Sequence, residues 1–407
     1  MIRKPALAVV GATGAVGAVM LELLSRNEDV WGAIRLVASP RSAGRKLAVR
    51  GEECEVVPLT EEALGGIDVA MFLVPAEVSA QWAPVAAAKG AVVVDASAAF
   101  RLDPDVPLVV PEINPHAIRV RPRGIVAGPH DTTLTMLPAV GALHAEFGLR
   151  QLVVASYQAV SGAGRDAVAV LRAQTALVAG TGLGETPGDV RRAVEATAGR
   201  RPGGAGHGAS GAGFGGSGAD FGAPGSGTGH SASGTGFGAP GSGAAATGFG
   251  PFPAPVALNV VPWTGEPAED GWSSEELGLR AEVRKVLDLP GLHVSATCVR
   301  VPVLTTHSLA VHARFESEVT VARAHEILAT SPGVVLFDDP AAGEFPTPAD
   351  VVGTDPTWVG RVRRSPDDPC ALELFVCGDN LRKGAALNTA QIAESVAQSL
   401  TPAHPVR

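Results

Sequence analysis

The sequence has little cysteine, few aromatic residues and little charge. Four cysteines among 407 residues (Cys54, Cys298, Cys370 and Cys377) show no CxxC or ligand-like spacing, which argues against a disulfide framework and a zinc site. Charged residues make up 18% and apolar residues 46%, so the chain is neither a polyelectrolyte nor wholly disordered. The net charge of −9 argues against a nucleic-acid partner, which requires a basic surface.

Long apolar runs without charge are also missing. No stretch is both apolar and uncharged over the roughly 18 residues that a membrane span requires, so no membrane association is expected. Arg3 and Lys4 precede an apolar run to Leu21 that imitates a secretory signal, but the run contains three glycines and lacks a small-residue cleavage pattern before Glu22. We therefore expect a soluble, cytoplasmic protein.

Glycine is abundant, and its excess is concentrated in one segment. Of the 50 glycines, 20 lie between residues 200 and 250, where Phe221–Gly227 is repeated as Phe237–Gly243. Such a segment buries too little apolar surface to offset its chain entropy. We predict a disordered low-complexity insertion at 200–250. A lengthened surface loop without function is the simpler interpretation, and contact with a partner is the alternative.

The length predicts two domains. Before residue 134, short apolar runs alternate with amphipathic ones, which predicts a parallel sheet with helices on both faces. The expected elements there are a helix at Gly14–Arg26 and strands at Ala6–Val10, Ile34–Ala38, Val69–Val74 and Ala91–Val94. Later strand-like segments suit a mixed or antiparallel sheet. They are Gln151–Tyr157, His293–Val303 and Ser308–Phe315, and a final helix is expected at Leu387–Leu400 after an Asn-rich turn.

A glycine-rich turn joins the first strand to the first helix. Its spacing is GxxGxxG over residues 11–17, which allows a tight turn and lets backbone N–H groups approach a pyrophosphate at a helix N-terminus. The residues expected to contact a dinucleotide there are Gly11, Thr13, Gly14, Ala15 and Val16.

The residues after the second strand indicate which dinucleotide is bound. An NAD-binding protein usually has Asp or Glu at this place, to bind the ribose hydroxyls. This chain instead has Ser39, Arg41 and Ser42. One cation and two hydroxyls suit a 2′-phosphate, so the sequence favours NADP.

Seven collinear segments resemble the aspartate-β-semialdehyde dehydrogenase family. They are VGATGAVG (10–17), SPRSAG (39–44), DASAAFR (95–101), VPLVVPEIN (106–114), SYQAVSGAG (156–164), SATCVRVPVLTTHSLAV (295–311) and DNLRKGAALNTAQIAE (379–394). The resemblance covers the chain apart from the glycine-rich segment. It implies an α/β fold with a Rossmann-like NADP-binding domain (1–134), an α+β catalytic and dimerisation domain (135–379) and a C-terminal helix (380–402) that returns to the first domain.

The reaction implied by the resemblance belongs to amino-acid biosynthesis. It is the NADPH-dependent reduction of L-aspartyl-4-phosphate to the semialdehyde by a homodimer, through a cysteine thioester and with a histidine relaying protons. Residues matching the family's functional positions are Gln158 (substrate orientation), His307 (proton relay), Arg300 (substrate carboxylate) and Arg101 (phosphate). Further cofactor-binding candidates are Ser161, Gly162 and Asn380, the last near the nicotinamide.

The nucleophile position departs from the family. Where the family reads close to NPNCST, residues 128–133 read GPHDTT, so Asp131 stands in place of the cysteine. A carboxylate is a weak nucleophile toward an aldehyde, and the mixed anhydride that it would form in place of the thioester would be hydrolysed by water. Losing a covalent nucleophile from cooperating residues costs about 10⁴–10⁶ in turnover. We therefore expect the family reaction to be severely weakened or lost.

A second departure concerns the substrate site. The family has a Glu-x-x-Lys pattern, in which the glutamate holds the amine and the lysine holds phosphate. This chain keeps Glu275 but has Gly278 in the lysine position. One of two cations is missing, which suggests that an acyl phosphate is no longer the ligand.

Three hypotheses remain open for a chain that binds a small amino-acid-like molecule. The first is a redox enzyme with a non-covalent reaction, in which Asp131 and His307 form a carboxylate–imidazole pair that donates a proton. The second is a non-catalytic NADP-binding paralogue with a regulatory or partner-binding role. The third is conventional dehydrogenase activity with His130 or Thr132 as the nucleophile.

Overall fold

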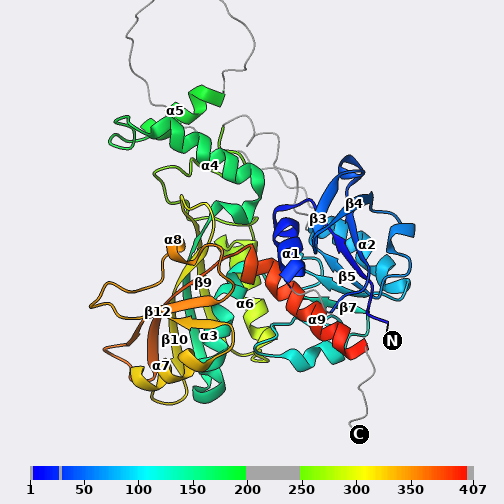
Figure 1. The fold of residues 1–407 in the computed structure, drawn as a ribbon. Coiled ribbons are helices and arrows are strands. Elements are labelled where there is room, and N and C mark those ends of the chain that lie inside the picture. The colour runs from blue at the N-terminus through cyan, green and yellow to red at the C-terminus, as the bar shows by residue number, and fades with distance from the viewer. Residues whose placement is uncertain (1–2, 27–29, 199–247, 401–407) are drawn as a thin grey trace, which may run out of the picture.

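The computed structural model describes residues 3–26, 30–198 and 248–400. Their backbone forms two β-sheets, one from the N-terminal part and one from the central and C-terminal part of the chain (Figure 1). Most of the predicted insertion at 200–250 lies outside the described residues. No helix in the described part is long and apolar enough to cross a bilayer.

The first sheet has seven strands in the order β3-β4-β2-β1-β5-β6-β7. Their bounds are β1 Leu7–Val10, β2 Ile34–Ala38, β3 Lys46–Val49, β4 Glu52–Pro58, β5 Val69–Phe72, β6 Val92–Asp95 and β7 Ile125–Ala127. All neighbours pair in parallel except β3, which pairs antiparallel with β4. Helices α1 (Ala15–Arg26) and α2 (Ala76–Ala88) follow β1 and β5. The predicted strand–helix alternation is therefore present.

The second sheet has six strands in the order β11-β12-β13-β10-β8-β9. Their bounds are β8 Leu149–Gln158, β9 His293–Arg300, β10 His307–Phe315, β11 Val334–Leu336, β12 Thr357–Arg364 and β13 Ala371–Gly378. Strands β8 and β9 are parallel, and β10 is antiparallel to β8 and β13, so the sheet is mixed as predicted. Helices α3 (Asp131–Phe147), α6 (Ser274–Val286) and α7 (Val321–Thr330) pack against it. The short helix α8 spans Pro348–Val351.

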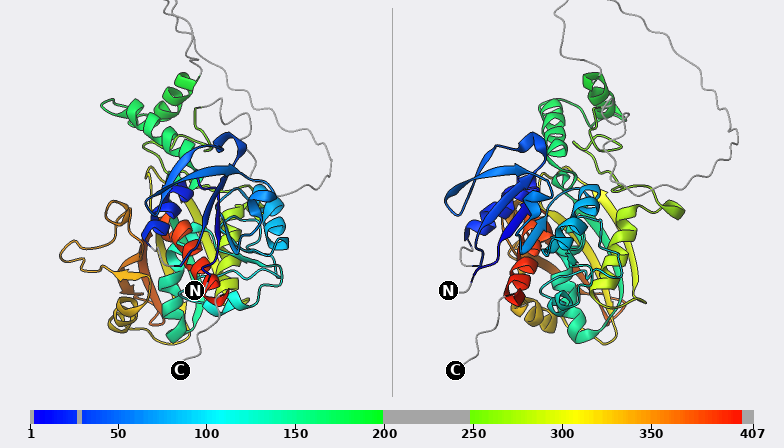
Figure 2. Two further views of the ribbon diagram at one scale, coloured as in Figure 1. Left: turned by 45° about the vertical axis from the view of Figure 1, so that its right-hand side comes forward. Right: turned by 90° about the vertical axis from the view of Figure 1, so that its right-hand side faces the viewer.

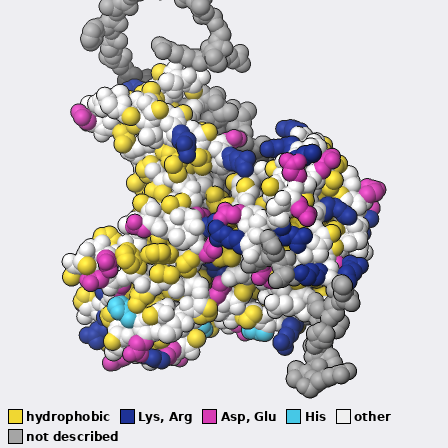
Figure 3. Space-filling view, in the orientation of Figure 1, with side chains coloured by type: hydrophobic (Ala, Val, Ile, Leu, Met, Phe, Trp, Pro, Cys, Tyr) yellow, Lys and Arg dark blue, Asp and Glu magenta, His cyan; other side chains and the backbone are white. Residues whose placement is uncertain are grey.

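Two further helices project from the body of the molecule. Figures 1 and 2 show α4 (Arg165–Val178) and α5 (Asp189–Ala198) standing out as an arm. A separate apolar cluster, to which Leu171, Phe252 and Val256 belong, holds the base of this arm. Apolar side chains gather over the arm and the second sheet in Figure 3, while many Lys and Arg side chains gather toward the first sheet.

The last described helix packs against the first sheet. Helix α9 (Asn388–Leu400) buries Ile392 and Val396 in the same cluster as Val9 and Met71. The expected turn is present at Asn380–Leu381, but a π-helix that was not expected, Arg382–Leu387, separates it from α9. A π-helix is rare and carries no simple sequence pattern, so only the structure identifies it.

Candidate active site

Three strand ends meet at one edge of the second sheet. Gln158 ends β8, Arg300 ends β9, and His307 begins β10. Gln158 and Arg300 pair across the parallel strands, and the antiparallel β10 brings its first residues beside the end of β8. Asp131, the first residue of α3, follows the last strand of the first sheet. The candidate site therefore lies between the two sheets.

Asp131 lies between two imidazole rings. Its Oδ1 is 2.8 Å from His130 Nδ1, and its Oδ2 is 3.2 Å from His307 Nε2. The Thr132 N–H donates to Oδ1 at 2.8 Å, as expected for an anion at a helix N-terminus. Burial raises the pKa of the Asp131 carboxyl, but the two histidines outweigh it and hold that pKa well below its ordinary value. Asp131 is therefore a carboxylate at neutral pH.

His307 is held in one tautomer. Its side chain is 1% exposed, and its Nδ1 accepts a hydrogen bond from the Ala159 N–H at 3.2 Å. A nitrogen that accepts carries no proton, so the hydrogen-bond network assigns the proton to Nε2, which faces Asp131. The predicted pairing of Asp131 with His307 is present as a short contact. It is not a hydrogen bond, and Nε2 has no hydrogen-bond partner among the described residues.

His130 is the second imidazole at this carboxylate. Its Nδ1 is 3.8 Å from Glu275 Oε1, in addition to the contact with Asp131. Burial lowers the pKa of His130, but the charges of Asp131 and Glu275 outweigh it and raise that pKa to about 9. His130 is thus an imidazolium at neutral pH, which disfavours the nucleophilic role considered for it from the sequence.

Gln158 and Glu275 contact each other directly. Gln158 Nε2 donates to Glu275 Oε1 and, at 3.1 Å, to Ser156 Oγ. Thr132 Oγ1 also donates to Glu275 Oε1, at 3.3 Å. The Gln158 Oε1 atom is buried and has no partner among the described residues. Buried acceptors are nearly always paired, so this atom marks a place where a ligand group could donate.

Arg300 brings a buried cation to the same site. Its Nη1 donates to the Ala159 carbonyl at 2.7 Å, and the guanidinium lies 6.0 Å from the Phe252 ring centroid. Burial lowers the pKa of Arg300, but an arginine stays charged in proteins. A Cβ at Gly162 would lie 3.2 Å from Arg300 Nη1 and 3.3 Å from the His307 ring. A glycine there keeps space open beside both side chains.

Arg101 is fully engaged within the protein. It donates to the carbonyls of Gly128 (3.1 Å) and Ala96 (2.9 Å) and to Glu282 Oε1 (3.3 Å). Glu282 is 3% exposed. Its Oε2 also accepts the His130 N–H at 2.9 Å and the Thr133 hydroxyl at 2.7 Å.

The sequence interpretation missed Glu282 as a site residue. It lies seven residues after Glu275, two turns along one face of α6, and that spacing could have identified it. The position of the absent lysine is open, because a Cβ at Gly278 would meet no atom within 4 Å.

No reactive thiol accompanies these groups. Cys298 lies two residues before Arg300 on β9 and is completely buried. Burial and the nearby Glu275 charge raise the pKa of its thiol to about 12, so it is not a thiolate at neutral pH. Within the described residues, no group of three or more His, Cys, Asp or Glu side chains is arranged to hold a metal ion.

Gly11 in the glycine-rich turn has a backbone conformation that favours glycine. Gly11 has φ = +96°, and a Cβ there would lie 2.2 Å from the Leu73 carbonyl oxygen. Thr13 Oγ1 lies 3.4 Å from Ser42 Oγ, so the turn adjoins the loop after β2. Ala15 and Val16 begin α1, while Ser39 and Arg41 are exposed.

Asn380 connects two loops at the same side of the site. Its Oδ1 accepts from the Ser161 hydroxyl and from the Thr306 N–H, both at 3.0 Å. Thr306 has φ = +85°, an uncommon conformation for a β-branched residue, directly before His307. The Asn380 Nδ2 is buried and has no partner among the described residues. An unpaired donor is therefore available here.

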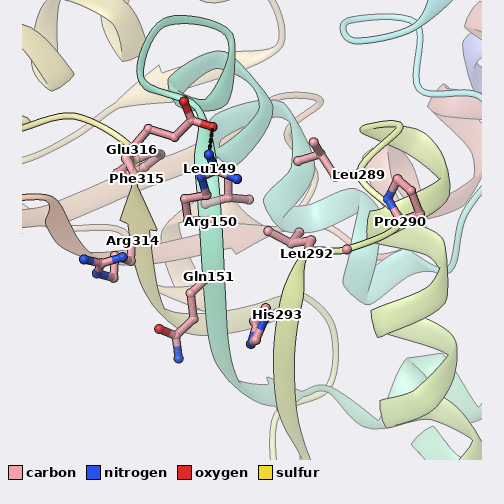
Figure 4. Close-up of a pocket in the computed structure, with 11 residues that line it drawn as sticks. Leu149, Arg150, Gln151, Leu289, Pro290, Leu292, His293, Arg314, Phe315 and Glu316 are labelled. Atoms are coloured by element: carbon pink, nitrogen blue, oxygen red, sulfur yellow. Dashed lines mark ion pairs between the residues drawn. The ribbon is translucent and has the colours of Figure 1, made fainter.

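A surface pocket lies elsewhere on the second sheet. It has a volume of about 690 Å³ and is bounded by the starts of β8 and β9 and the end of β10 (Figure 4). Arg150 pairs with Glu316 at its wall, at 2.9 Å. The candidate site is at the opposite ends of these strands, so this pocket contains none of its residues.

The fold and the site define a two-domain dehydrogenase class with a nicotinamide-nucleotide-binding domain. Residues 6–121 match the family model "Semialdehyde dehydrogenase, NAD binding domain". Residues 140–383 match "Semialdehyde dehydrogenase, dimerisation domain". The predicted two-domain α/β fold class is confirmed.

Comparison with individual proteins narrows the class. The chain is 42% identical to the aspartate-semialdehyde dehydrogenase of Corynebacterium melassecola over 395 residues, covering 95% of this chain and 98% of the relative. It is 40% identical to that of Streptomyces akiyoshiensis over 395 residues, covering 96% and 98%. The chain therefore belongs to the aspartate-semialdehyde dehydrogenase family, as its motifs predicted.

Solved structures agree. A structure of aspartate semialdehyde dehydrogenase II from Vibrio cholerae, complexed with ASA, is 32% identical and superimposes with a TM-score of 0.77, covering 97% of this chain and 99% of that one. The Candida albicans aspartate semialdehyde dehydrogenase with NADP is 20% identical, with a TM-score of 0.62 over 96% and 98%, and shows the shared fold alone.

Proposed function

We propose that this chain is an NADP-dependent oxidoreductase for a small amino-acid-derived aldehyde or acyl phosphate, and that the covalent route implied by its family is closed. The single observation that carries the second part is Asp131 at the start of α3, where a thiol would be required. Its carboxylate is held between two imidazoles, and the thiol of Cys298 is buried and protonated. A thioester intermediate has no sulfur atom on which to form.

The cofactor residues fit NADP. Gly11 lets the turn approach a pyrophosphate, and Arg41, Ser39 and Ser42 offer a cation and hydroxyls without a carboxylate at the end of β2. When bound, the nicotinamide supplies or accepts a hydride at its C4 atom. The unpaired Asn380 Nδ2 would donate to the nicotinamide carboxamide, with Ser161 and Gly162 lining the same place.

The remaining polar residues suit a small amino-acid-like substrate. Arg300 would hold its carboxylate in a bidentate pair. Glu275 would hold an ammonium group, and the unpaired Gln158 Oε1 would orient the reacting end. His307 would hold its proton toward Asp131.

The phosphate subsite is weak. Gly278 provides no cation, and the charge of Arg101 is neutralised by Glu282 at 3.3 Å. An acyl phosphate would therefore be held less firmly than in a site with both cations free, and an aldehyde is the better substrate.

We further propose that the protein is a cytoplasmic homodimer. Each chain would have a first domain at 1–134, completed by residues 380–402, and a second domain at 135–379. The dimerisation-domain match supports self-association. So does the face of the second sheet opposite its helices, on which Val153 (39% exposed) and Tyr157 (38% exposed) alternate with buried residues of β8. Apolar side chains exposed in a row are typical of protein contact surfaces.

Two measurements test the function. Calorimetric titration should show NADPH binding more tightly than NADH. The Asp131→Cys variant, given L-aspartate 4-semialdehyde, NADP and phosphate, should gain phosphate-dependent aldehyde oxidation of at least 100-fold over the wild type, and Asp131→Cys/Gly278→Lys should gain more. A substrate-derived thioester trapped on the wild-type chain by mass spectrometry, or the absence of any NADPH binding, would refute the proposal.

Several polar side chains of the site pair with each other, which favours a second candidate function, that of a non-catalytic NADP-binding paralogue. Glu275 is taken by Gln158 and Thr132, and Arg101 is taken by Glu282. For such a protein, NADPH would bind but no aldehyde would oxidise it. Partners captured by the full chain would be lost on deletion of residues 200–250.

A further inference from the structure

We infer that His130, not His307, is the proton donor of this site, and that the site directly reduces a small carbonyl compound bearing a carboxylate to the corresponding alcohol. This inference rests on the proposed oxidoreductase function and goes beyond it. It names the acid, the substrate class and the product.

The first step of the argument concerns His307. Because its Nδ1 accepts the Ala159 N–H, a second proton on the ring would face that N–H and break the contact. The ring is 1% exposed, so solvent cannot readily replace a proton that it gives up. His307 therefore holds one proton toward Asp131 and is poorly placed to donate and recover another in each turnover.

His130 differs from His307 in its surroundings. Its Nδ1 lies 2.8 Å from Asp131 Oδ1, and its side chain is 27% exposed, so solvent can reprotonate it. The Thr132 N–H lies 3.4 Å from the same Nδ1 but donates to Asp131 Oδ1 at 2.8 Å, so the carboxylate is the closer partner of both groups. No hydrogen bond to its Nε2 is found within the described part of the chain. With Nδ1–H bound to the carboxylate, Nε2–H is left to face a substrate oxygen. This is the imidazole–carboxylate pair of general acid catalysis.

The charges around His130 keep it protonated. Asp131 and Glu275 favour the imidazolium, and the pKa of about 9 expresses their combined effect against burial. Arg101 opposes them, but its own charge is neutralised by Glu282, which also fixes the His130 N–H. Asp131, which replaces the cysteine of the family, thus serves as the carboxylate that orients His130.

The substrate class follows from the other charges. Arg300 is a buried cation suited to a carboxylate, and the subsite for phosphate lacks the cation that Gly278 would have provided. With neither a thiol nor a phosphate to handle, what remains is a carboxylate anchor, a proton donor and a nucleotide-binding turn. These are the parts that carbonyl reduction needs.

The step balances without an intermediate on the protein. The carbonyl carbon takes a hydride from the reduced nicotinamide, the C=O π bond breaks, and the oxygen forms an O–H bond with the proton that leaves His130 Nε2. The products are an alcohol and the oxidised nicotinamide. His130 then recovers its proton from water.

The kinetic test uses the wild-type protein with NADPH and L-aspartate 4-semialdehyde, succinic semialdehyde or glyoxylate, without phosphate. NADPH oxidation should accompany formation of the alcohol, identified by mass spectrometry. His130→Gln should lower the rate about 10²–10⁴-fold while NADPH affinity stays within about twofold. The control His293→Gln, an exposed residue at the distant pocket, should retain full rate.

A second readout needs neither cofactor nor turnover. In the NMR titration of the histidine Cε1–H signals, the His130 signal should titrate near pH 9 in the wild type and at lower pH in Asp131→Asn. Because the acid must be protonated, the reduction rate should be level at neutral pH and fall as pH rises through about 9. A shift of that fall to lower pH in Asp131→Asn would support the pairing.

The results that would refute this inference differ from those that would refute the proposed function. Absence of NADPH binding would overturn both. If NADPH binds and Asp131→Cys gains phosphate-dependent oxidation, but no alcohol forms from the panel, only the present inference is wrong. It is equally wrong if His130→Gln keeps its rate while His307→Gln loses it, or if the His130 signal titrates near 6.5.

Discussion

At the scale of single residues, the cofactor turn offers a direct test of backbone geometry. Gly11→Ala should destabilise the fold by about 3 kcal/mol or more. The reasons are that a positive φ costs an L-residue about 1–2 kcal/mol and that the new Cβ would lie 2.2 Å from the Leu73 carbonyl oxygen. Gly44→Ala is the matched control, since Gly44 has φ = +81° but nothing within 4 Å. It should cost only about 1–2 kcal/mol by urea denaturation. Equal costs for the two would contradict the steric argument.

Arg41 tests the choice of nucleotide. An exposed arginine that pairs with a 2′-phosphate contributes about 1.5–3 kcal/mol, so Arg41→Ala should weaken NADPH binding roughly 10–100-fold and leave NADH binding unchanged. Titration calorimetry with both nucleotides measures this. Lys46→Ala, in β3 and paired with the exposed Glu53, is the control. A parallel loss of NADH affinity would show that Arg41 acts on the loop rather than on the phosphate.

Single residues also show how far a sequence can lead. The substitution at Asp131 and the loss of a cation at Gly278 could be recognised from the chain alone, because each sits in a motif with fixed spacing. The charge state of His130 could not, since it depends on Glu275, a residue 145 positions later whose side chain comes within 3.8 Å only in the fold. The internal pairing of Arg101 with Glu282 is equally non-local.

At the scale of elements, α6 decides where two site carboxylates lie. Ser273 caps it reciprocally with Glu276, with Oγ accepting the Glu276 N–H at 3.3 Å and its own N–H donating to Glu276 at 2.9 Å. Ser273→Ala should cost about 1 kcal/mol of stability and lower the pKa of His130, because a frayed first turn moves Glu275 away. Denaturation and the histidine NMR titration measure the two effects.

The matched control is the N-cap of α7. Thr320 accepts the Arg323 N–H at 3.2 Å but is exposed and outside the candidate site. Thr320→Ala should cost a similar amount of stability and leave the His130 titration unchanged. A shift in both variants would mean that any loss of stability disturbs the site.

Elements differ in how readily sequence patterns predict them. The buried parallel strands were predicted within two residues at each end, because continuous apolar runs next to glycine turns leave few alternatives. The β3–β4 hairpin was missed, since its strands are short and mostly polar. The π-helix Arg382–Leu387 was not predicted, and it lies against the start of α3, where a Cβ at Gly384 would lie 2.7 Å from Asp131 Cβ.

At the scale of the whole molecule, the site exists only because two distant parts of the chain meet. Asp131 and Arg101 follow strands of the first sheet, whereas Glu275, Arg300 and His307 belong to the second sheet and its helix α6. The hydrogen bonds of Glu282 to His130 and Thr133 cross this junction. Stability of the junction and geometry of the site are therefore coupled.

The C-terminal segment secures the junction through a buried ion pair. Lys383, 1% exposed, donates to Glu112 at 2.7 and 2.8 Å and to Gln391 at 3.0 Å. Removing one partner leaves a buried charge unpaired, so Lys383→Met should destabilise the protein by about 3–5 kcal/mol. In Lys383→Met/Glu112→Leu no unpaired charge remains, and much of that stability should return.

The comparison pair is Arg323 with Glu146, at 2.6 Å between α7 and α3 but 49% and 39% exposed. Solvent screens such a pair, so Arg323→Met should cost under about 1 kcal/mol. Urea denaturation of all three variants measures the loss of stability. It is followed at Trp31, which is buried against the first sheet, and at Trp358 of β12, so it also shows which sheet is affected. Because the pair connects the C-terminal segment to the segment between β6 and β7, Lys383→Met should lower both transitions together. In a contradicting result, the Trp358 signal would keep the wild-type urea midpoint while the Trp31 midpoint falls. The two sheets would then be stable independently, and the site would not depend on the Lys383–Glu112 pair.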